Sequence, residues 1–341
     1  MRSRLHIYLS ILFLFTFTAL QAQDPVFSQF FTTPMQLNPA FAGNTLAPRI
    51  SINYRTQWLW PAPTNVYRTY SASYGQFFEP LNSSIGLMVE ADNAGEGIYK
   101  TNRVSAFYGY RLKINDGLFI KSGIDIGFVQ STLNWNQLTF LDQIDPIEGI
   151  VSPSDEVPIE NLTRSYGTVG AGLLAYGKNF YAGFGAKHLN TPNEALTVIS
   201  DNLNSGLPMR FSAQAGGQFT FQKGNKKNAA SFISPNVTYI QQGDFAQLNG
   251  GAYLGYRSFF GGIWYRHAFS NSDAAIFLVG AEVDIFRIGY SYDFTVSGLA
   301  ASSGGTGGAS EITIVLNFEN SAEFKRRRRS NRYNDCLKIF R

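Results

Sequence analysis

The sequence predicts an all-β fold, a transmembrane outer-membrane β-barrel of about fourteen antiparallel strands with an N-terminal periplasmic segment and a short basic C-terminal tail. Three observations support this prediction. The chain begins with an export leader and has no later apolar stretch long enough for a transmembrane helix. Many segments alternate between apolar and polar or small residues. The connections between these segments alternate in length.

Residues 1–22 have the pattern of a secretory signal peptide. Arg2 and Arg4 flank the start of an apolar run from Leu5 to Leu20, and the small residue Ala22 precedes Gln23. This order of basic, apolar and small residues predicts export followed by cleavage. A single membrane anchor is the weaker alternative, because the run is short for the ~20 apolar residues that span a bilayer.

The composition agrees with a barrel better than with a small disulfide-bonded domain. Aromatic residues make up 15% of the chain, charged residues also 15%, and there are 33 glycines. The sole cysteine, Cys336, excludes an intrachain disulfide framework. Outer-membrane barrels place aromatic girdles at both membrane interfaces, so an exported, aromatic-rich chain without helical spans favours this class.

Residues 23–48 show neither helical nor strand periodicity. Pro25, Pro34 and Pro39 each lack a backbone donor, which argues against a regular strand. The phenylalanines that need burial are Phe27, Phe30, Phe31 and Phe41. We expect this Pro/Phe-rich segment to fold back at, or into, the periplasmic mouth of the barrel, as a plug or as a docking surface.

Residues 49–318 carry the alternation expected of barrel strands. Ile124, Ile126 and Phe128 fall on one face of their segment, and Asp125 and Gly127 fall on the other. Several segments reach the ~9–11 residues that a tilted membrane strand needs. The predicted strands are 49–58, 66–78, 83–92, 102–113, 117–129, 165–176, 179–188, 207–221, 229–240, 245–256, 259–267, 274–284, 287–295 and 310–318.

The lengths of the connections predict the orientation of the barrel. The longest connections, 130–164, 189–206 and 296–309, all fall on the same side of the predicted strand order, while connections such as Asn115-Asp116 and Gly177-Lys178 fall on the other. Barrels have short periplasmic turns and longer external loops. In a soluble β-sandwich there is no reason why the odd-numbered connections should be longer than the even-numbered ones, so this fold is the weaker alternative.

Charge follows the same division. The loop from Ser131 to Thr163 holds six carboxylates and no Lys or Arg; it lacks the spacing of a calcium loop, and a solvated surface is its simplest interpretation. Residues 319–341 form a basic tail on the periplasmic side. Its run of consecutive basic residues is Lys325, Arg326, Arg327, Arg328 and Arg329, and a run of this kind is typical of an interaction tail. An anionic cell-wall polymer or an acidic partner would suit it, and export argues against nucleic acid.

The sequence shows no convincing catalytic, metal or cofactor site. His188 and His267 are the only histidines after the leader, and the nearness of Ser270 and Asn271 to His267 is weak evidence for a lipase-like triad. Two distant histidines and one tail cysteine do not predict a metal site. We therefore predict a protein that is not an enzyme and needs no cofactor.

The stretch DPVFSQFFTTPMQLNPAFAG resembles the N-terminal signature of the PorP/SprF family of the Bacteroidetes type IX secretion system. The matching residues are Asp24, Pro25, Phe27, Ser28, Gln29, Phe30, Asn38, Pro39, Ala40, Phe41, Ala42 and Gly43. The resemblance continues more loosely through the early strands and covers the chain in length and layout. The family also tends to end in a basic, Cys-containing tail, but here Leu337 rather than a proline follows Cys336.

This resemblance implies an outer-membrane barrel that works in protein secretion without catalysis. It implies partners of two kinds: a secreted, adhesin-like surface protein whose export and retention serve gliding motility or adhesion, or the periplasmic ring and peptidoglycan-binding subunits of the machine. The barrel wall would contact outer-membrane lipid. The motif residues would form the plug or docking segment.

Two other functions remain open on the sequence. A transporter resembling the fatty-acid channels would also combine a barrel with an N-terminal hatch, although the inward faces offer no clear apolar lining. A soluble, exported β-sandwich that binds a ligand is the second.

Overall fold

A computed structural model describes residues 23–58, 67–145, 147–150, 153–158, 161–196, 206–222, 230–269, 273–297, 307–321 and 324. The predicted signal peptide, the basic residues Lys325 to Arg329 and Cys336 lie outside these ranges. Among the described residues, no helix is long and apolar enough to cross a membrane.

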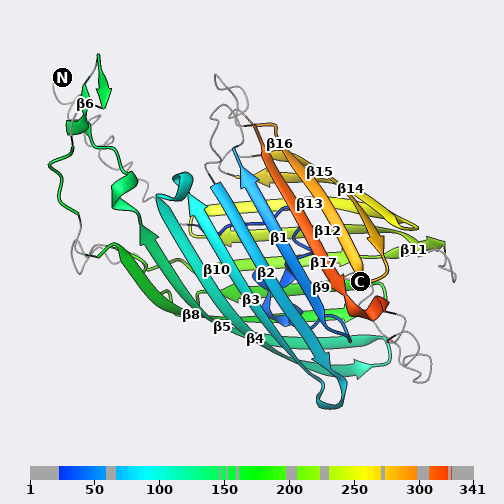
Figure 1. The fold of residues 1–341 in the computed structure, drawn as a ribbon. Coiled ribbons are helices and arrows are strands. Elements are labelled where there is room, and N and C mark those ends of the chain that lie inside the picture. The colour runs from blue at the N-terminus through cyan, green and yellow to red at the C-terminus, as the bar shows by residue number, and fades with distance from the viewer. Residues whose placement is uncertain are drawn as a thin grey trace, which may run out of the picture.

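Fourteen antiparallel strands close into a barrel, as predicted (Figure 1). They are β1 Arg49–Gln57, β2 Tyr67–Phe78, β3 Ser83–Ala94, β4 Tyr99–Asn115, β5 Leu118–Leu133, β8 Thr163–Gly177, β9 Phe180–Lys187, β10 Arg210–Gly217, β12 Ser231–Gln242, β13 Phe245–Tyr256, β14 Phe259–Ala268, β15 Ala274–Val283, β16 Phe286–Thr295 and β17 Ala309–Asn317. Closure comes from the pairing of β1 with β17 and of β10 with β12.

Three short strands lie outside this ring of fourteen. β11 Phe219–Gln222 follows β10 and pairs only with the beginning of β12. The predicted strand 207–221 is therefore interrupted, because the Gln218 amide donates to the Asn179 carbonyl instead of continuing the ladder. β6 Ile144–Asp145 and β7 Gly149–Ile150 form a small hairpin in the longest loop, which projects from the barrel in Figure 1.

The alternation of side chains gives the barrel two different surfaces. On β5, the outward residues Ile124, Ile126 and Phe128 are 53%, 64% and 56% exposed, whereas the inward residues Lys121 and Asp125 are 1% and 2% exposed. A barrel has no second sheet to cover its outer face. The apolar band therefore meets lipid, and the polar faces meet the lumen.

The two ends of the barrel differ in their connections. The loop end carries 134–162, 188–209 and 296–308, and the turn end carries the short connections 79–82, 116–117, 178–179, 257–258 and 284–285. Three connections depart from the rule. At the loop end, 95–98 and Gly243-Asp244 are short, and at the turn end 223–230 is longer.

Gln23–Pro48, here called the lumenal segment, lies inside the barrel. It contains one turn of α-helix, α2 Pro34–Leu37, and one 3-10 turn, η1 Pro39–Phe41. Both begin with a proline, whose fixed φ suits the first helical position and whose missing donor costs nothing there. Nearly every residue of this segment from Asp24 to Gly43 is buried.

Candidate functional site

The lumenal segment runs along the barrel axis instead of staying at one mouth. Its first residues contact the loop end, where the Asp24 amide donates to Gln242 Oε1 at 3.0 Å. It reaches the turn end near Gly43, whose carbonyl accepts a hydrogen bond from Lys121 Nζ at 3.1 Å. We expected the segment to fold back at, or into, the periplasmic mouth; in the structure it lies inside the barrel and extends as far as the loop end. The polar groups that bind the first residues of the segment lie on the halves of the strands nearest the loop end.

Asp24 is the centre of a buried ion-pair network at the loop end. Asp24 Oδ1 lies 2.5 Å from Arg103 Nη2, and Asp24 Oδ2 lies 2.6 Å from His188 Nε2 and 3.4 Å from Arg210 Nη1. Burial by itself raises the pKa of Asp24, but Arg103, His188 and Arg210 outweigh it and hold the pKa well below its ordinary value. One carboxylate of the lumenal segment thus pairs with side chains of β4 and β10 and with His188, which directly follows β9.

Glu90 extends this network to α2. Glu90 Oε1 accepts from Arg103 Nη1 at 3.0 Å, and its other oxygen accepts from Gln36 Nε2 at 2.8 Å. Gln36 Nε2 also donates to the Pro25 carbonyl at 2.9 Å. The two ends of the first half of the lumenal segment are therefore tied to each other and to β3.

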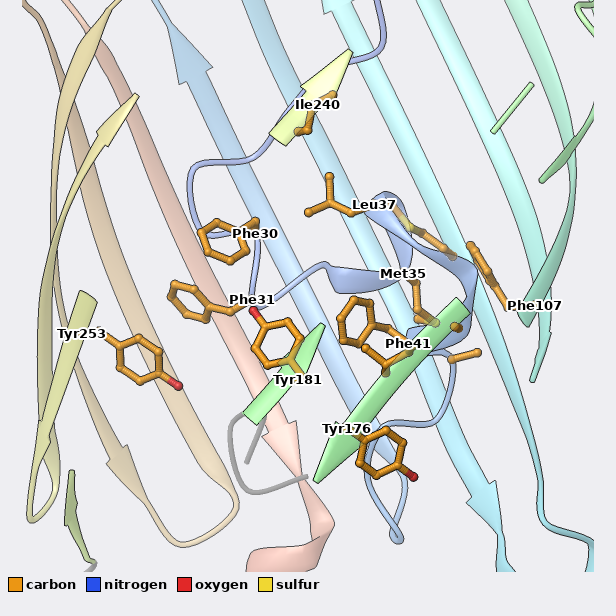
Figure 2. Packing of buried hydrophobic residues seen from close by; sticks show 14 of the residues in the cluster. Phe30, Phe31, Met35, Leu37, Phe41, Phe107, Tyr176, Tyr181, Ile240 and Tyr253 are labelled. Carbon is orange, nitrogen blue, oxygen red and sulfur yellow. The ribbon is translucent and has the colours of Figure 1, made fainter. Parts of the chain in front are cut away.

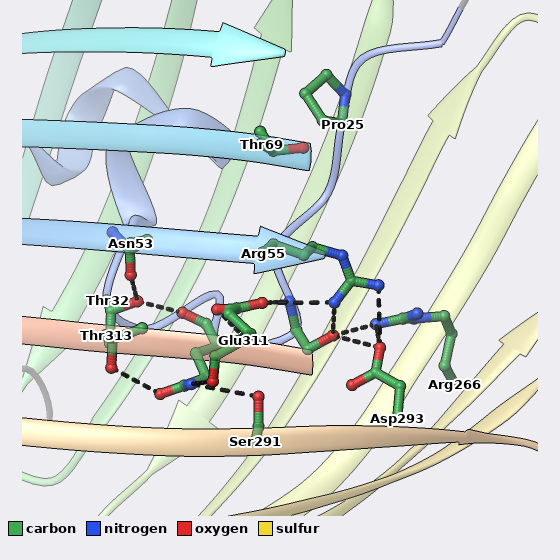
Figure 3. A network of polar contacts seen from close by, with 12 residues as sticks. Pro25, Thr32, Asn53, Arg55, Thr69, Arg266, Ser291, Asp293, Glu311 and Thr313 are labelled. Atoms are coloured by element: carbon green, nitrogen blue, oxygen red, sulfur yellow. Dashed lines mark hydrogen bonds and ion pairs between the residues drawn. The ribbon is translucent and has the colours of Figure 1, made fainter. Parts of the chain in front are cut away.

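Ser28 and Gln29 form a second network with side chains of β1, β14, β16 and β17. Figure 3 labels the four charged residues of this network on the wall. Ser28 Oγ donates to Asp293 Oδ2 at 2.6 Å and accepts from Arg55 and Arg266, each also at 2.6 Å. The carboxylate of Glu311 accepts from the backbone amides of Ser28 and Gln29 at 2.8 and 3.1 Å. Hydrogen bonds to charged groups are stronger than neutral ones, so this network fixes both the position and the direction of the backbone.

The Gln29 side chain completes that attachment. Its amide nitrogen donates to Ser291 Oγ and to the Glu311 carbonyl, both at 3.2 Å, and its oxygen accepts from Thr313 Oγ1 at 2.9 Å. These partners lie on the inward faces of β16 and β17. A primary amide offers donors and an acceptor on one rigid plane, which matches this set of partners.

Three phenylalanines of the lumenal segment, Phe30, Phe31 and Phe41, enter an apolar cluster rich in aromatic rings (Figure 2). Phe31 stacks on Tyr253 and Trp264 with ring centroids 5.3 and 5.9 Å apart, and Phe41 meets Tyr181 edge-on at 5.9 Å. The sequence suggested inward faces without a clear apolar lining, but the structure shows that they also carry aromatic residues. On the strands that carry Tyr181, Tyr253 and Trp264, an inward aromatic residue stands between small or polar inward residues. The average composition of an inward face therefore does not reveal the aromatic cluster.

The turn at Asn38-Pro39-Ala40-Phe41 fits against a part of the wall made of glycine. Asn38 Oδ1 accepts from the Ala40 amide at 2.9 Å, and its Nδ2 donates to the Leu173 carbonyl at 3.0 Å. A Cβ atom at Gly172 would overlap Asn38 Oδ1, and one at Gly123 would overlap the backbone of Pro39 and Ala40. These glycines on β5 and β8 allow the turn to touch the wall directly.

Gly43, near the turn end, has a backbone conformation that suits glycine. Its φ is +51°, and a Cβ there would overlap the Gln76 carbonyl. Lys121 Nζ donates to the carbonyls of Ala42 and Gly43. Leu46 N then donates to Glu319 Oε1, which ties the end of the segment to the chain after β17.

The structure thus brings the predicted motif residues together in the lumen. Phe27, Phe30 and Ala40 are buried there, and Pro25 follows Asp24. Their partners on the barrel wall, above all Arg55, Arg103, Asp293 and Glu311, were not predicted from the sequence. The sequence did contain one indication of these partners: charged residues at inward positions of predicted strands. A buried charge without a partner is unstable, so each such residue indicates a partner inside the barrel.

Other residues considered in the sequence have local roles. His267 is 4.8 Å from Phe269 between ring centroids and binds Asp273 through Nδ1 at 3.1 Å; Ser270 and Asn271 lie outside the described residues. In the acidic loop, hydrogen bonds from Ser154 and from the Asp155 amide lower the pKa of Asp142. No group of His, Cys, Asp and Glu that could hold a metal ion occurs in the described ranges.

Comparison with known proteins identifies the family. The profile of the type IX secretion system membrane protein PorP/SprF matches residues 19–316. The chain belongs to the PorP/SprF family. This PorP/SprF protein is thus an outer-membrane β-barrel component of the type IX secretion system, and the family favours neither a fatty-acid-channel-like transporter nor an enzyme.

Solved structures resemble this PorP/SprF protein only distantly. The Acinetobacter baumannii outer membrane protein Omp33 is 8% identical, with a TM-score of 0.43 over 80% of this chain and 99% of that one. The CymD monoaromatic hydrocarbon channel is 12% identical, with a TM-score of 0.41 over 84% and 91%. A Pseudomonas aeruginosa FadL homologue is 9% identical, with a TM-score of 0.38 over 80% and 90%. Comparison with curated proteins finds no match.

Proposed function

We propose that this PorP/SprF protein supports the export and cell-surface retention of a secreted, adhesin-like partner, in gliding motility or adhesion, and that it does so without catalysis. The observation that carries this proposal is that the lumen is filled by a segment of the chain itself, whereas the loops at one end of the barrel are exposed. The family motif holds the lumenal segment inside the barrel, which leaves the loop end as the surface for a partner. The cleaved signal peptide would bring the chain to the outer membrane.

The lumenal segment serves in this proposal as a fixed plug. Its two polar networks tie it to strands on all sides of the barrel, and its phenylalanines fill the space between them. Removing one partner of a buried ion pair costs about 3–5 kcal/mol. Asp24 pairs with several cationic side chains and Ser28 hydrogen-bonds to charged groups, so the segment stays in place. A fixed plug closes the lumen to solutes and makes the loop end a stable platform.

The arm at 134–162 is the main contact surface at the loop end. It carries the hairpin β6–β7, and Leu141 and Ile147 on it are 90% and 94% exposed. Asp142 follows Leu141 in the sequence, and Glu148 follows Ile147. Exposed apolar side chains with a polar rim are typical of protein contact sites. Because longer loops are external in barrels, this arm would face a partner on the cell surface.

The second candidate function is a link to the periplasmic ring and peptidoglycan-binding subunits. The basic residues Lys325 to Arg329 favour it, because in the sequence they follow β17, a strand that ends at the turn end, and they carry only positive charge. An anionic cell-wall polymer or an acidic subunit would suit this charge.

Affinity purification from detergent-solubilised outer membrane separates the two functions. The baits are the full chain, a variant without residues 135–160, and a variant with Lys325 to Arg329 changed to Ser. We expect a secreted surface protein with the full chain and with the tail variant, and its loss with the arm deletion. Recovery of ring subunits alone, lost with the tail variant, would overturn the adhesin role in favour of the ring.

A further inference from the structure

A cavity of about 470 Å³ lies at the loop end, above the beginning of the lumenal segment. Residues Gln23 to Val26 line one side of it, and inward side chains of β1 to β4, β8, β13 and β14 line the others. Its volume falls in the range of ~300–1,000 Å³ typical of ligand pockets. The function proposed above does not use this cavity.

The charges around the cavity do not cancel. Arg55 and Arg266 lie within ion-pair distance of Asp293, and Arg55 also of Glu311. Arg103 likewise forms ion pairs with Asp24 and Glu90, and Arg210 forms one with Asp24.

Two carboxylates that line the cavity remain after this pairing. Asp92 and Glu194 have hydrogen bonds, from Thr69 Oγ1 at 2.6 Å and from Tyr166 respectively, but within the described ranges neither has a cation at ion-pair distance. Arg103, which acts on both from farther away, is already paired with two other carboxylates. Arg164, the nearest basic residue in sequence to Tyr166, uses its Nε to bind the Asn193 carbonyl at 3.2 Å and does not line the cavity. The cavity therefore keeps uncompensated negative charge.

Aromatic rings gather on the same side as these carboxylates. Tyr67, Tyr99 and Tyr166 line the cavity beside Asp92 and Glu194. Trp58 also lines it, and its ring meets that of Tyr67 edge-on at 5.0 Å. A carboxylate among aromatic faces suits a cation, because the ring quadrupole and the negative charge attract it together.

The opposite side of the cavity offers unpartnered donors. Gln247 lines it and is only 3% exposed, and its amide nitrogen has no hydrogen-bond partner within the described ranges. Arg266 Nε, also on this side, has none either. A buried donor without a partner costs free energy, so this side suits a group that brings a carbonyl oxygen.

We propose that this cavity binds a lysine or arginine side chain of a polypeptide, with the cation between Asp92 and Glu194 and the peptide carbonyl groups toward Gln247 and Arg266. The aromatic rings would pack against the aliphatic stem of the lysine or arginine side chain and contact its cationic group. The proposal rests on the proposed function only for the source of that polypeptide, the exported partner. Binding of the side chain itself is a property of this barrel alone.

Isothermal titration calorimetry on the full-length protein in detergent tests this directly. The probes are the capped peptides acetyl-Gly-Arg-Gly-amide and acetyl-Gly-Lys-Gly-amide, with the Gln and Glu versions as controls. We expect the two cationic peptides to bind and the other two not to bind. The double variant Asp92→Asn, Glu194→Gln should weaken the cationic peptides at least tenfold, as expected for the loss of charge-assisted contacts.

The control is Asp244→Asn, which removes an exposed loop-end carboxylate that does not line the cavity; its binding should match the wild type. Heat-dependent migration on gels shows that each variant is a folded barrel. Equal binding of Arg and Glu peptides, no binding to the wild type, or no effect of the double variant would each overturn the proposal. If the double variant loses the peptides but still recovers the surface protein, the cavity proposal stands and the partner docks elsewhere.

Discussion

Asp24 and Arg103, which are 79 positions apart in the chain, form an ion pair of 2.5 Å with side chains only 4% and 8% exposed. The first motif residue of the lumenal segment is thus held by the fourth strand of the barrel. Arg103 also pairs with Glu90. The motif therefore has an architectural role that can be tested one contact at a time.

Asp24→Asn should release the beginning of the lumenal segment. Arg103 and Arg210 would keep their positive charges without this carboxylate, and breaking one side of a buried pair costs about 3–5 kcal/mol. Hydrogen exchange of the backbone amides of residues 24–32 measures the effect. Asp116→Asn is the matched control, because the Asp116 side chain is 95% exposed in its pair with Lys113. Equal protection in both variants would contradict the anchoring role of Asp24.

The contribution of Asp24 should depend on pH in a defined direction. Its pKa in the folded protein lies well below the ordinary value of 3.8, so the folded state favours the carboxylate. The stability that it adds is complete above that ordinary value and is lost only as the pH falls through the lowered pKa. The difference in protection between wild type and Asp24→Asn should therefore be constant from pH 7 to 5. A difference that declines over this interval would contradict the ion-pair assignment.

Phe31→Ala should loosen the middle of the lumenal segment. Phe31 is 5% exposed and stacks on Tyr253 and Trp264, and truncation of a buried Phe costs about 3–5 kcal/mol. Limited proteolysis of the folded barrel should then cut within residues 23–48. Phe128→Ala removes the same group from the outer face, where the side chain is 56% exposed, and should leave the segment resistant.

Gly172→Ala should displace the turn at Asn38. The added Cβ would overlap Asn38 Oδ1, and overpacking of this kind costs about 1–3 kcal/mol. Gly167→Ala on the same strand is the control, since its Cβ would have its nearest neighbour at 3.9 Å. Hydrogen exchange at the Ala40 and Phe41 amides should rise in the first variant alone. The same exchange in both would show that the glycine wall is not needed for the turn.

A barrel without residues 24–43 should conduct ions in planar bilayers. These residues fill the lumen between the two polar networks, and their removal leaves a polar interior open from end to end. The wild type and the variant without residues 135–160 should remain closed over the same voltages. A deletion variant that folds but stays closed would contradict the role of the lumenal segment as a plug.

The sequence alone determined much of the barrel. Alternation such as that of Ile124 to Phe128 is a local property, because neighbouring side chains of a strand point to opposite faces. It therefore predicted the number of strands, and most boundaries agree with the structure to within a few residues. At the loop end the beginning of β4 was placed too late and the end of β5 too early, since pairing continues there through Lys100 and Thr132.

The lumenal segment was predicted in composition but not in position. Its prolines excluded a strand and its phenylalanines required burial, and both are intrinsic to the residues. Only the tertiary structure decided that Ser28 would meet Asp293 and that Asn38 would meet Gly172. These contacts join residues more than a hundred positions apart, and they arise because closure of the barrel turns the polar faces of distant strands toward one enclosed space.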